Sequence, residues 1–184
     1  MNNHVKDAKN RMDKSIEAFR EEIAKVRTGK ATTALLDGIK VDYYGTLSPL
    51  KQVGNVSVLD AHTLSITPWD KSLVSVIDRA ILEANLGLNP QNDGTNIKIP
   101  IPPLTEERRK ELVKLVKKFG EDAKVAVRNV RRDANNHLKQ SEKNKEISED
   151  DLKRFEDEIQ KLTDDHVKKI DEIISHKEKE IMEV

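Results

Sequence analysis

Basic side chains follow one face of a long helix that the second half of the sequence predicts. At 100° per residue they fall within about 100° of one another, on the side away from the helix's apolar stripe. No aspartate or glutamate lies between Lys124 and Arg132. A guanidinium group donates two hydrogen bonds to one phosphate and also stacks on bases, so this face predicts an RNA-binding surface. Its members are Lys117, Lys124, Arg128, Arg131, Arg132, Asn135 and Lys139.

The same charges have a second interpretation, because most long helices carry a solvated charged face. The predicted helix from Thr105 to Gln140 holds eleven bases against six acids, and the segment from Ser141 onwards holds nine bases against fifteen acids. An acid-rich helix packed alongside can therefore pair with the arginines. Spacing alone leaves RNA contact and a solvated or internally paired face both open.

Other residue types give little sign of catalysis or of a bound cofactor. The chain has no cysteine, which excludes disulfides, thiol catalysis and zinc sites that need sulfur. The five histidines have no metal-ligand spacing with carboxylates, and His166 belongs to an apolar stripe. The acid pairs Asp150–Asp151 and Asp164–Asp165 fit a helix start and a solvated face better than a catalytic pair. We therefore expect no catalytic residue, no cofactor and no metal.

The basic face lies on the second of three long helices predicted outside the centre of the chain. Apolar residues recur every three or four positions from about Asn2 to Thr28, from near Thr105 to about Gln140, and from Ser148 onwards. Three such helices can bury their stripes against one another as an antiparallel bundle. We assign residues 1–29 and 105–184 to this bundle, which carries the RNA-binding face.

Residues 30–104 differ from their flanks in composition and period. They contain only six bases and seven acids, and apolar and polar residues alternate in several stretches, which predicts strands. An amphipathic helix is expected between Leu73 and Ala84. We therefore predict an inserted β/α/β domain, a small sheet covered by one helix, with Trp69 in its core or at its rim. The alternation is centred on Val41, Val56, Leu64 and Ile99.

Two segments connect the predicted insert to the predicted bundle, one containing glycine and one rich in proline. A joint made of two connections restricts twisting but still allows a pivot. We therefore expect an elongated, bent α+β molecule with a hinge. The hinge residues are predicted to be Gly29, Lys30, Ala31, Pro102, Pro103 and Leu104.

Composition limits the partners of the chain. Its 184 residues suffice for one large or two small domains, and its formal net charge is +0, so nucleic-acid binding must come from a local patch. No apolar run approaches the roughly 20 residues of a membrane span, and the N-terminus lacks the apolar core of a signal peptide. We expect a cytosolic monomer, because three helices can bury their own apolar stripes.

Five segments resemble the ribosome recycling factor family. They are LLDGIKVDYYGTLSPLKQ (Leu35 to Gln52), LGLNP (Leu86 to Pro90), IPIPPLTEERRKEL (Ile99 to Leu112), VAVRNVRRDAN (Val125 to Asn135) and KEISEDD (Lys145 to Asp151). The likeness covers nearly the whole chain, with the motifs in the family's order and spacing. Lys30 stands where the family often has arginine, which keeps the charge but loses the bidentate geometry.

The resemblance implies a three-helix bundle and a hinged β/α/β domain, in an L shape similar to transfer RNA. It implies a non-enzymatic cytoplasmic factor that binds the ribosome after termination. With elongation factor G and GTP, such a factor splits the ribosome into subunits, and messenger and deacylated transfer RNA are released. The bundle is expected to contact large-subunit ribosomal RNA, while the smaller domain faces elongation factor G, which hydrolyses the GTP. The implied RNA contacts are Arg128, Arg131 and Arg132, with Asn135 beside them.

Two rival functions remain open on the residues alone. A helical adaptor would use the bundle as a platform without binding RNA, and only the acid-free basic face argues against it. An enzyme would need a cluster of titratable residues in a concave pocket of the insert, which has few charges to build one.

Overall fold

The computed structural model describes residues 2–183 of the chain. The chain divides into two compact units. One unit joins Met1–Thr28 to Glu106–Val184, and the other is Gly29–Thr105. Each unit has its own apolar core.

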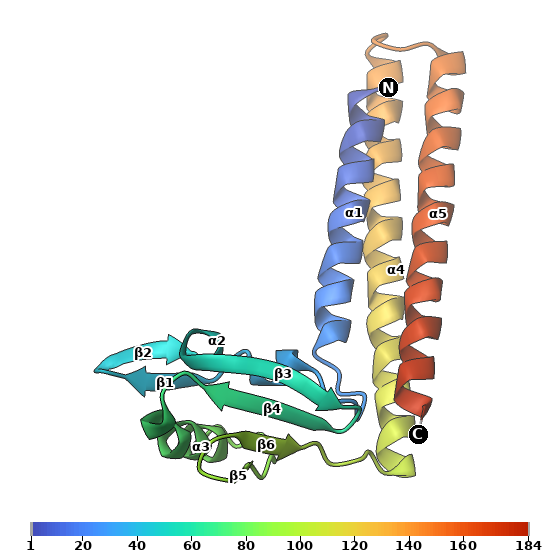
Figure 1. The fold of residues 1–184 in the computed structure, drawn as a ribbon. Coiled ribbons are helices and arrows are strands. Elements are labelled where there is room, and N and C mark those ends of the chain that lie inside the picture. The colour runs from blue at the N-terminus through green and yellow to red at the C-terminus, as the bar shows by residue number, and fades with distance from the viewer. Residues whose placement is uncertain (1, 184) are drawn as a thin grey trace. The chain divides into compact units, whose positions relative to one another are not determined.

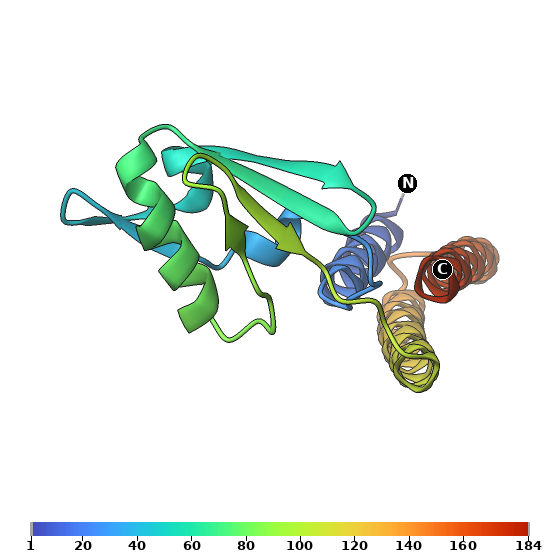
Figure 2. The same cartoon turned by 60° about the horizontal axis from the view of Figure 1, so that its bottom comes forward.

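Three long helices make up the first unit: α1 (Asn3–Ala24), α4 (Glu106–Lys143) and α5 (Glu149–Met182). Each helix packs against the other two, and α4 runs antiparallel to both α1 and α5 (Figure 1). Figure 2 views the same three helices more nearly end-on. The predicted antiparallel three-helix bundle is confirmed.

The apolar stripes of the three helices meet along the axis of the bundle. Burying one such side chain stabilises the fold by about 1.5–3 kcal/mol, so the stripes fix the rotation of each helix about its axis. The orientation of the polar flanks of α4 follows from this packing. Fully buried members of the bundle core include Met12, Val116, Val127, Leu138, Ile159 and Ile170.

The ends of the helices differ from the predicted ends by a few residues. α1 ends at Ala24 rather than near Thr28, because the amides of Lys25 and Val26 donate to carbonyl groups only three residues back. α4 runs three residues beyond the predicted end at Gln140. α5 begins as predicted: the hydroxyl of Ser148 accepts a hydrogen bond from the amide three residues further on.

The second unit contains two antiparallel sheets, not the single sheet expected. One sheet pairs β1 (Lys40–Tyr43) with β2 (Thr46–Pro49). The other has the order β3-β4-β6-β5, with β3 (Gly54–Asp60), β4 (Thr63–Pro68), β5 (Gln91–Asn92) and β6 (Ile97–Pro100). Helices α2 (Leu50–Val53) and α3 (Val74–Glu83) and the short 3-10 helices η1 (Thr33–Leu36) and η2 (Lys71–Leu73) complete the unit.

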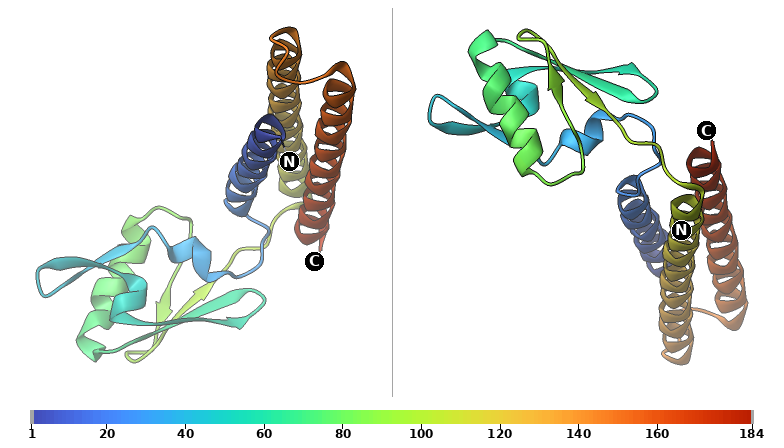
Figure 3. Two further views of the ribbon diagram at one scale, coloured as in Figure 1. Left: turned by 90° about the horizontal axis from the view of Figure 1, so that it is seen from above. Right: turned by 90° about the horizontal axis from the view of Figure 1, so that it is seen from below.

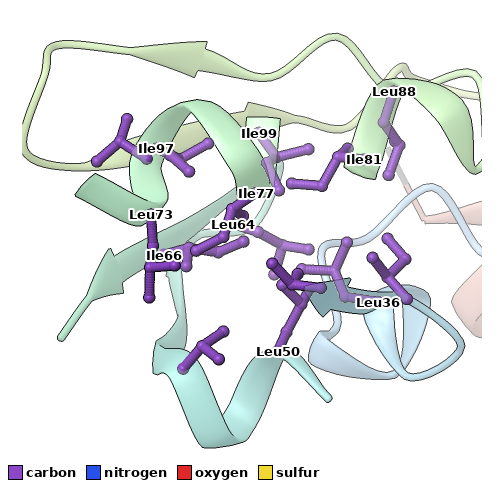
Figure 4. Packing of buried hydrophobic residues seen from close by; sticks show 14 of the residues in the cluster. Leu36, Leu50, Leu64, Ile66, Leu73, Ile77, Ile81, Leu88, Ile97 and Ile99 are labelled. Atoms are coloured by element: carbon purple, nitrogen blue, oxygen red, sulfur yellow. The ribbon is translucent and has the colours of Figure 1, made fainter. Parts of the chain in front are cut away.

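The second unit has an apolar core between α3 and the sheets. Ile77 and Ile81 of α3 lie beside Leu64 of β4 and Ile99 of β6 (Figure 4). All four side chains are fully buried. The predicted helix and the four alternating stretches are therefore confirmed. Trp69 follows β4 and is 68% exposed, which places it at the rim of the unit and not in its core.

Both connecting segments are hydrogen-bonded to the turn between β3 and β4. The amide of Ala31 donates a hydrogen bond of 2.8 Å to the carbonyl oxygen of Ala61. The amide of Ile101 donates one of 2.7 Å to the carbonyl oxygen of His62. The ring nitrogen Nδ1 of His62 lies 3.2 Å from the carbonyl oxygen of Gly29. Figure 3 shows both segments close to this turn. The two segments therefore belong to the second unit, and their hydrogen bonds fix the points at which the chain leaves that unit.

Candidate nucleic-acid interface

The arginines of α4 are positioned by the buried residues between them. Val127 and Val130 point into the bundle core. Arg128 and Arg131 therefore fall on the neighbouring flank of the helix, where they are half-buried, and Arg132 is exposed. The backbone of this stretch is continuous helix, so the three guanidinium groups are carried on one rigid element.

Three guanidinium groups on this flank have no internal partner. Within residues 2–183, Arg128, Arg131 and Arg132 make no ion pair and no side-chain hydrogen bond. Asp133, the acid next to Arg132, does not neutralise them, because its carboxylate accepts a 2.9 Å hydrogen bond from Arg11 of α1. No sequence pattern predicted that contact, since the two residues are far apart in the chain. The arginines remain available to an external anion.

Two lysines of the predicted face are paired with α5. The ammonium group of Lys124 forms an ion pair with Asp171 and lies 3.3 Å from Glu121, and its side chain is only 13% exposed. The hydrogen bond to Asp171 raises the pKa of Lys124 above its ordinary value, with a smaller contribution from Glu121. Lys117 lies 3.7 Å from Glu178. The acid-rich third helix therefore pairs with part of the basic face, as the second interpretation of the sequence allowed.

The last two members of the face differ from each other. Lys139 is exposed and makes no ion pair or side-chain hydrogen bond within residues 2–183. Asn135 is half-buried, and its side-chain oxygen is buried without a hydrogen-bond partner in the described part of the chain. Leaving such an oxygen unsatisfied costs about 1–3 kcal/mol. The structure thus brings all seven predicted residues onto one flank but divides them into a paired half and an open half.

The open half, from Arg128 to Lys139, suits a phosphate backbone. Each charge-assisted bond from a guanidinium group to a phosphate contributes about 1.5–3 kcal/mol. Residues four apart on a helix rise by about 6 Å, close to the spacing of successive phosphates along a strand. We name this set the arginine flank: Arg128, Arg131, Arg132 and Lys139.

The predicted hinge residues lie where the second unit begins and ends. Gly29 has a φ of +77°, in the left-handed region. A Cβ atom there would lie 3.3 Å from Cγ of Leu104, so the two connecting segments pass close to each other at these residues. Lys30, Pro102 and Pro103 are exposed beside them, and Ala31 is half-buried.

No other site of chemistry stands out. Across residues 2–183, no three His, Asp or Glu side chains gather closely enough to hold a metal ion. A hollow of about 30 Å³ in the second unit holds one acid and one base, and Asp37 and Lys51 lie 3.5 Å apart there. This space barely admits one water molecule. None of the described helices has the length and apolarity that crossing a bilayer requires.

Comparisons with known proteins agree along nearly the whole chain. A family model described as Ribosome recycling factor matches residues 19–182. The ribosome-recycling factor of Chlorobaculum parvum is 62% identical over 174 residues, which is 95% of this chain and 94% of the relative. That of a Geobacillus species is 57% identical over 180 residues, covering 98% and 97%.

Solved structures give the same result. A solution structure of the ribosome recycling factor is 46% identical with a TM-score of 0.76, covering 98% of this chain and 96% of that one. A second, described as the T. thermophilus ribosome recycling factor and the E. coli elongation factor G bound to the E. coli post-termination complex, is 44% identical with a TM-score of 0.63. It covers 98% of this chain and 97% of that one. The chain therefore belongs to the ribosome recycling factor family.

Proposed function

We propose that this chain binds the ribosome after termination and, with elongation factor G and GTP, splits it into subunits. Messenger and deacylated transfer RNA are then released. Family membership supports this function, and so does the similar structure described with elongation factor G on a post-termination complex. The structural observation that carries the proposal is the arginine flank of α4, whose guanidinium groups have no partner within residues 2–183.

The bundle serves as the anchor in this proposal. Arg128, Arg131 and Arg132 grip phosphates of large-subunit ribosomal RNA through charge-assisted bonds. Lys124 and Lys117 hold α5 against α4 instead, and so keep the helix that carries the arginines straight. Lys117 and Lys124 thus support the packing of the bundle, and the proposed RNA contacts are limited to the arginine flank.

The second unit serves as the lever. Both connecting segments are hydrogen-bonded to the β3–β4 turn. A force applied to this unit is therefore transmitted to the joint and is not absorbed by a flexible linker. The pivot then acts at Thr28 and Thr105, where the chain leaves the unit. Elongation factor G presses on this unit and supplies the energy of GTP hydrolysis, so the chain acts as a translation factor of the cytoplasm and not as an enzyme.

Polysome breakdown tests the function. Polysomes are incubated with elongation factor G, GTP and this chain, and subunits are separated on a sucrose gradient. Free subunits should appear only when all three are present, and Arg131→Ala should reduce their yield at limiting protein. The control is Arg154→Ala, which removes an exposed arginine from α5. Unchanged polysomes with the complete mixture would overturn the proposal.

Changing the joint tests the lever separately from the anchor. Gly29→Ala places a side chain at a φ of +77° and against Leu104. Gly94→Ala has the same kind of strain, at a φ of +88°, but open space around it. We expect Gly29→Ala to lower subunit splitting while ribosome binding is retained, and Gly94→Ala to leave splitting near the wild-type rate. Equal splitting by both variants would remove the joint from the mechanism.

The alternative that the residues alone left open was a helical adaptor. It would use the bundle surface to bind a protein and would not sediment with ribosomes. Co-sedimentation of the wild type with large subunits, lost on raising the salt concentration, would exclude it.

A further inference from the structure

The ion pairs between α4 and α5 form a ladder with a seven-residue step. Lys117 pairs with Glu178, and Lys124 pairs with Asp171. Moving seven residues forward on α4 matches moving seven residues back on α5, as expected for two antiparallel helices in constant register. Residues seven apart on a helix lie within about 20° of one another, so each rung falls on the same seam.

The next rung of this ladder is Arg131 with Asp164. Seven residues beyond Lys124 is Arg131, and seven residues before Asp171 is Asp164. The structure shows this rung open. Asp164 accepts a 2.9 Å hydrogen bond from the side-chain amide of Gln160, one turn earlier on α5, and Arg131 pairs with no carboxylate within residues 2–183.

The seam has a second unsatisfied position beside the open rung. Four residues beyond Arg131, the side-chain oxygen of Asn135 is buried without a hydrogen-bond partner in the described chain. By the same register its counterpart on α5 is Gln160, whose amide is held by Asp164. If Gln160 turned to Asn135, it would satisfy that oxygen and release Asp164. Two arrangements of these four side chains therefore compete.

We propose that Asp164 is an internal competitor of RNA phosphate for Arg131. In the free protein the third rung closes part of the time, with Asp164 on Arg131 and Gln160 on Asn135. On the ribosome a phosphate takes the guanidinium group, and Asp164 returns to Gln160. This inference rests on the proposed function, since it assigns a regulation to the RNA-binding flank.

The balance between the two arrangements is set by exposure. Asp164 lies on the exposed surface of α5, so its pairing with arginine is screened by water and salt. A backbone phosphate carries the same single charge as the carboxylate and accepts the same bidentate bonds, but on the ribosome several phosphates contact the arginine flank together. The rung therefore lowers ribosome affinity only modestly, and it disfavours weak anions that cannot displace a carboxylate.

The test uses two single substitutions that remove the same charge at adjacent positions. Asp164→Asn opens the rung permanently, and Asp165→Asn is its control, because Asp165 is also exposed on α5 but lies about 100° away around the helix. Affinity for large ribosomal subunits is measured at low salt. We expect Asp164→Asn to bind about two- to five-fold more tightly, the range for an exposed pair. The gain in affinity for Asp165→Asn should be less than half of the gain for Asp164→Asn.

A double variant identifies the partner of Asp164. In the Arg131→Ala background, Asp164→Asn should no longer tighten binding. Equal effects of Asp164→Asn and Asp165→Asn, or an effect that survives Arg131→Ala, would overturn the proposal.

The free protein gives a readout that does not need the ribosome. The side-chain Nε–H resonance of Arg131 should shift in Asp164→Asn and stay in place in Asp165→Asn; an unmoved resonance in both would overturn the rung. If Arg131→Ala leaves ribosome affinity unchanged, the RNA anchor itself fails. If Arg131→Ala weakens binding while the two asparagine variants bind alike, only the competitor is overturned.

Discussion

The imidazole of His166 in α5 lies between two oxygen acceptors and joins α5 to α1. Its Nε2 is 2.7 Å from the carboxylate of Asp13, and its Nδ1 is 2.6 Å from the carbonyl oxygen of Leu162. The residue is 3% exposed. The ammonium group of Lys9 also lies 3.0 Å from Asp13. The predicted position of His166 inside the bundle is confirmed, and it forms a polar cross-link there in place of an apolar contact.

Acid should weaken the bundle through this cross-link. The hydrogen bond from His166 holds the pKa of Asp13 below its ordinary value of 3.8, and Lys9 contributes in the same direction. A carboxylate with a lowered folded-state pKa gives stability that is complete above the ordinary pKa and is lost as the pH falls through the folded value. We therefore expect the Tm of the wild type to fall below about pH 4 more steeply than that of Asp13→Asn.

Thermal unfolding followed by circular dichroism over the acid range measures this difference. Three aspartates of the second unit also have lowered pKa values, but they titrate equally in both proteins and cancel in the comparison. Parallel curves for the wild type and Asp13→Asn would contradict the prediction.

Removal of His166 should be costly at any pH. His166→Ala leaves a cavity in the bundle and deprives Asp13 of its largest stabilising contact, so we expect a loss of about 2–4 kcal/mol in the free energy of unfolding. The control is His176→Ala, because the side chain of His176 is 77% exposed and within residues 2–183 pairs only with Glu180. Its expected cost is below about 0.5 kcal/mol. Urea denaturation of the two variants measures both losses. Similar midpoints would refute the structural role of His166.

Strong periodicity made the helices predictable. The stripes of the flanks run over many turns, and caps such as Ser148 mark a start chemically. Strand β2 was missed because its polarity is inverted: Leu47 is exposed, whereas Ser48 is buried. Alternation identifies a strand only where the apolar side chains face the core. The early end of α1 at Ala24 depends on the last hydrogen bonds of the helix, which no residue type at that position announces.

The basic face was predictable as a face but not as a site. The helical period placed Lys124 and Arg128 on one side of α4, and the structure agrees. Which charges stay free depends on the register between α4 and α5, and that register follows from how buried side chains interlock over the whole bundle. Lys117 and Lys124 have the same spacing along the chain as Asp171 and Glu178. This match indicates the register, but only once the two helices are known to be neighbours.

Gly120 allows the close approach of α5 to α4. It is buried, and a Cβ atom there would overlap the side chain of Ile174. Alanine is favoured over glycine in a helix by about 1 kcal/mol, but overpacking costs about 1–3 kcal/mol. We therefore expect Gly120→Ala to destabilise the bundle by up to about 2 kcal/mol. In the Ile174→Ala background the same change should become stabilising, since the overlap is gone.

A double-mutant cycle measured by urea denaturation gives the coupling between positions 120 and 174. Gly38→Ala is the control, because a Cβ atom at Gly38 meets nothing within 4 Å. Its effect should be small in either background. A cost of Gly120→Ala that does not change with Ile174→Ala would show that the close approach is not what requires glycine.

Lys124 and Arg132 should separate stability from RNA binding, although both are cations on one flank of α4. Lys124 is 13% exposed and paired with Asp171, so Lys124→Ala should lower the Tm and change ribosome affinity little. Arg132 is exposed and unpaired within residues 2–183, so Arg132→Ala should leave the Tm unchanged and weaken ribosome binding at least tenfold, equivalent to about 1.5 kcal/mol or more. If both variants lost the same property, the division of the flank into a paired and an open half would be wrong.

The salt dependence of ribosome binding should report how many cations of the open half neutralise phosphates. The arginine flank offers four cations, and each phosphate neutralised contributes about −0.7 to −0.9 to the slope of log affinity against log salt. We expect a slope of roughly −3 to −4 for the wild type and a slope smaller by about one unit for Arg132→Ala. For Lys124→Ala the slope should stay at the wild-type value, because that ammonium group already neutralises Asp171 in the free protein. A flat response of the wild type, or a steeper slope that requires all six cations of the predicted face, would show that the ion pairs with α5 do not decide which charges reach the RNA.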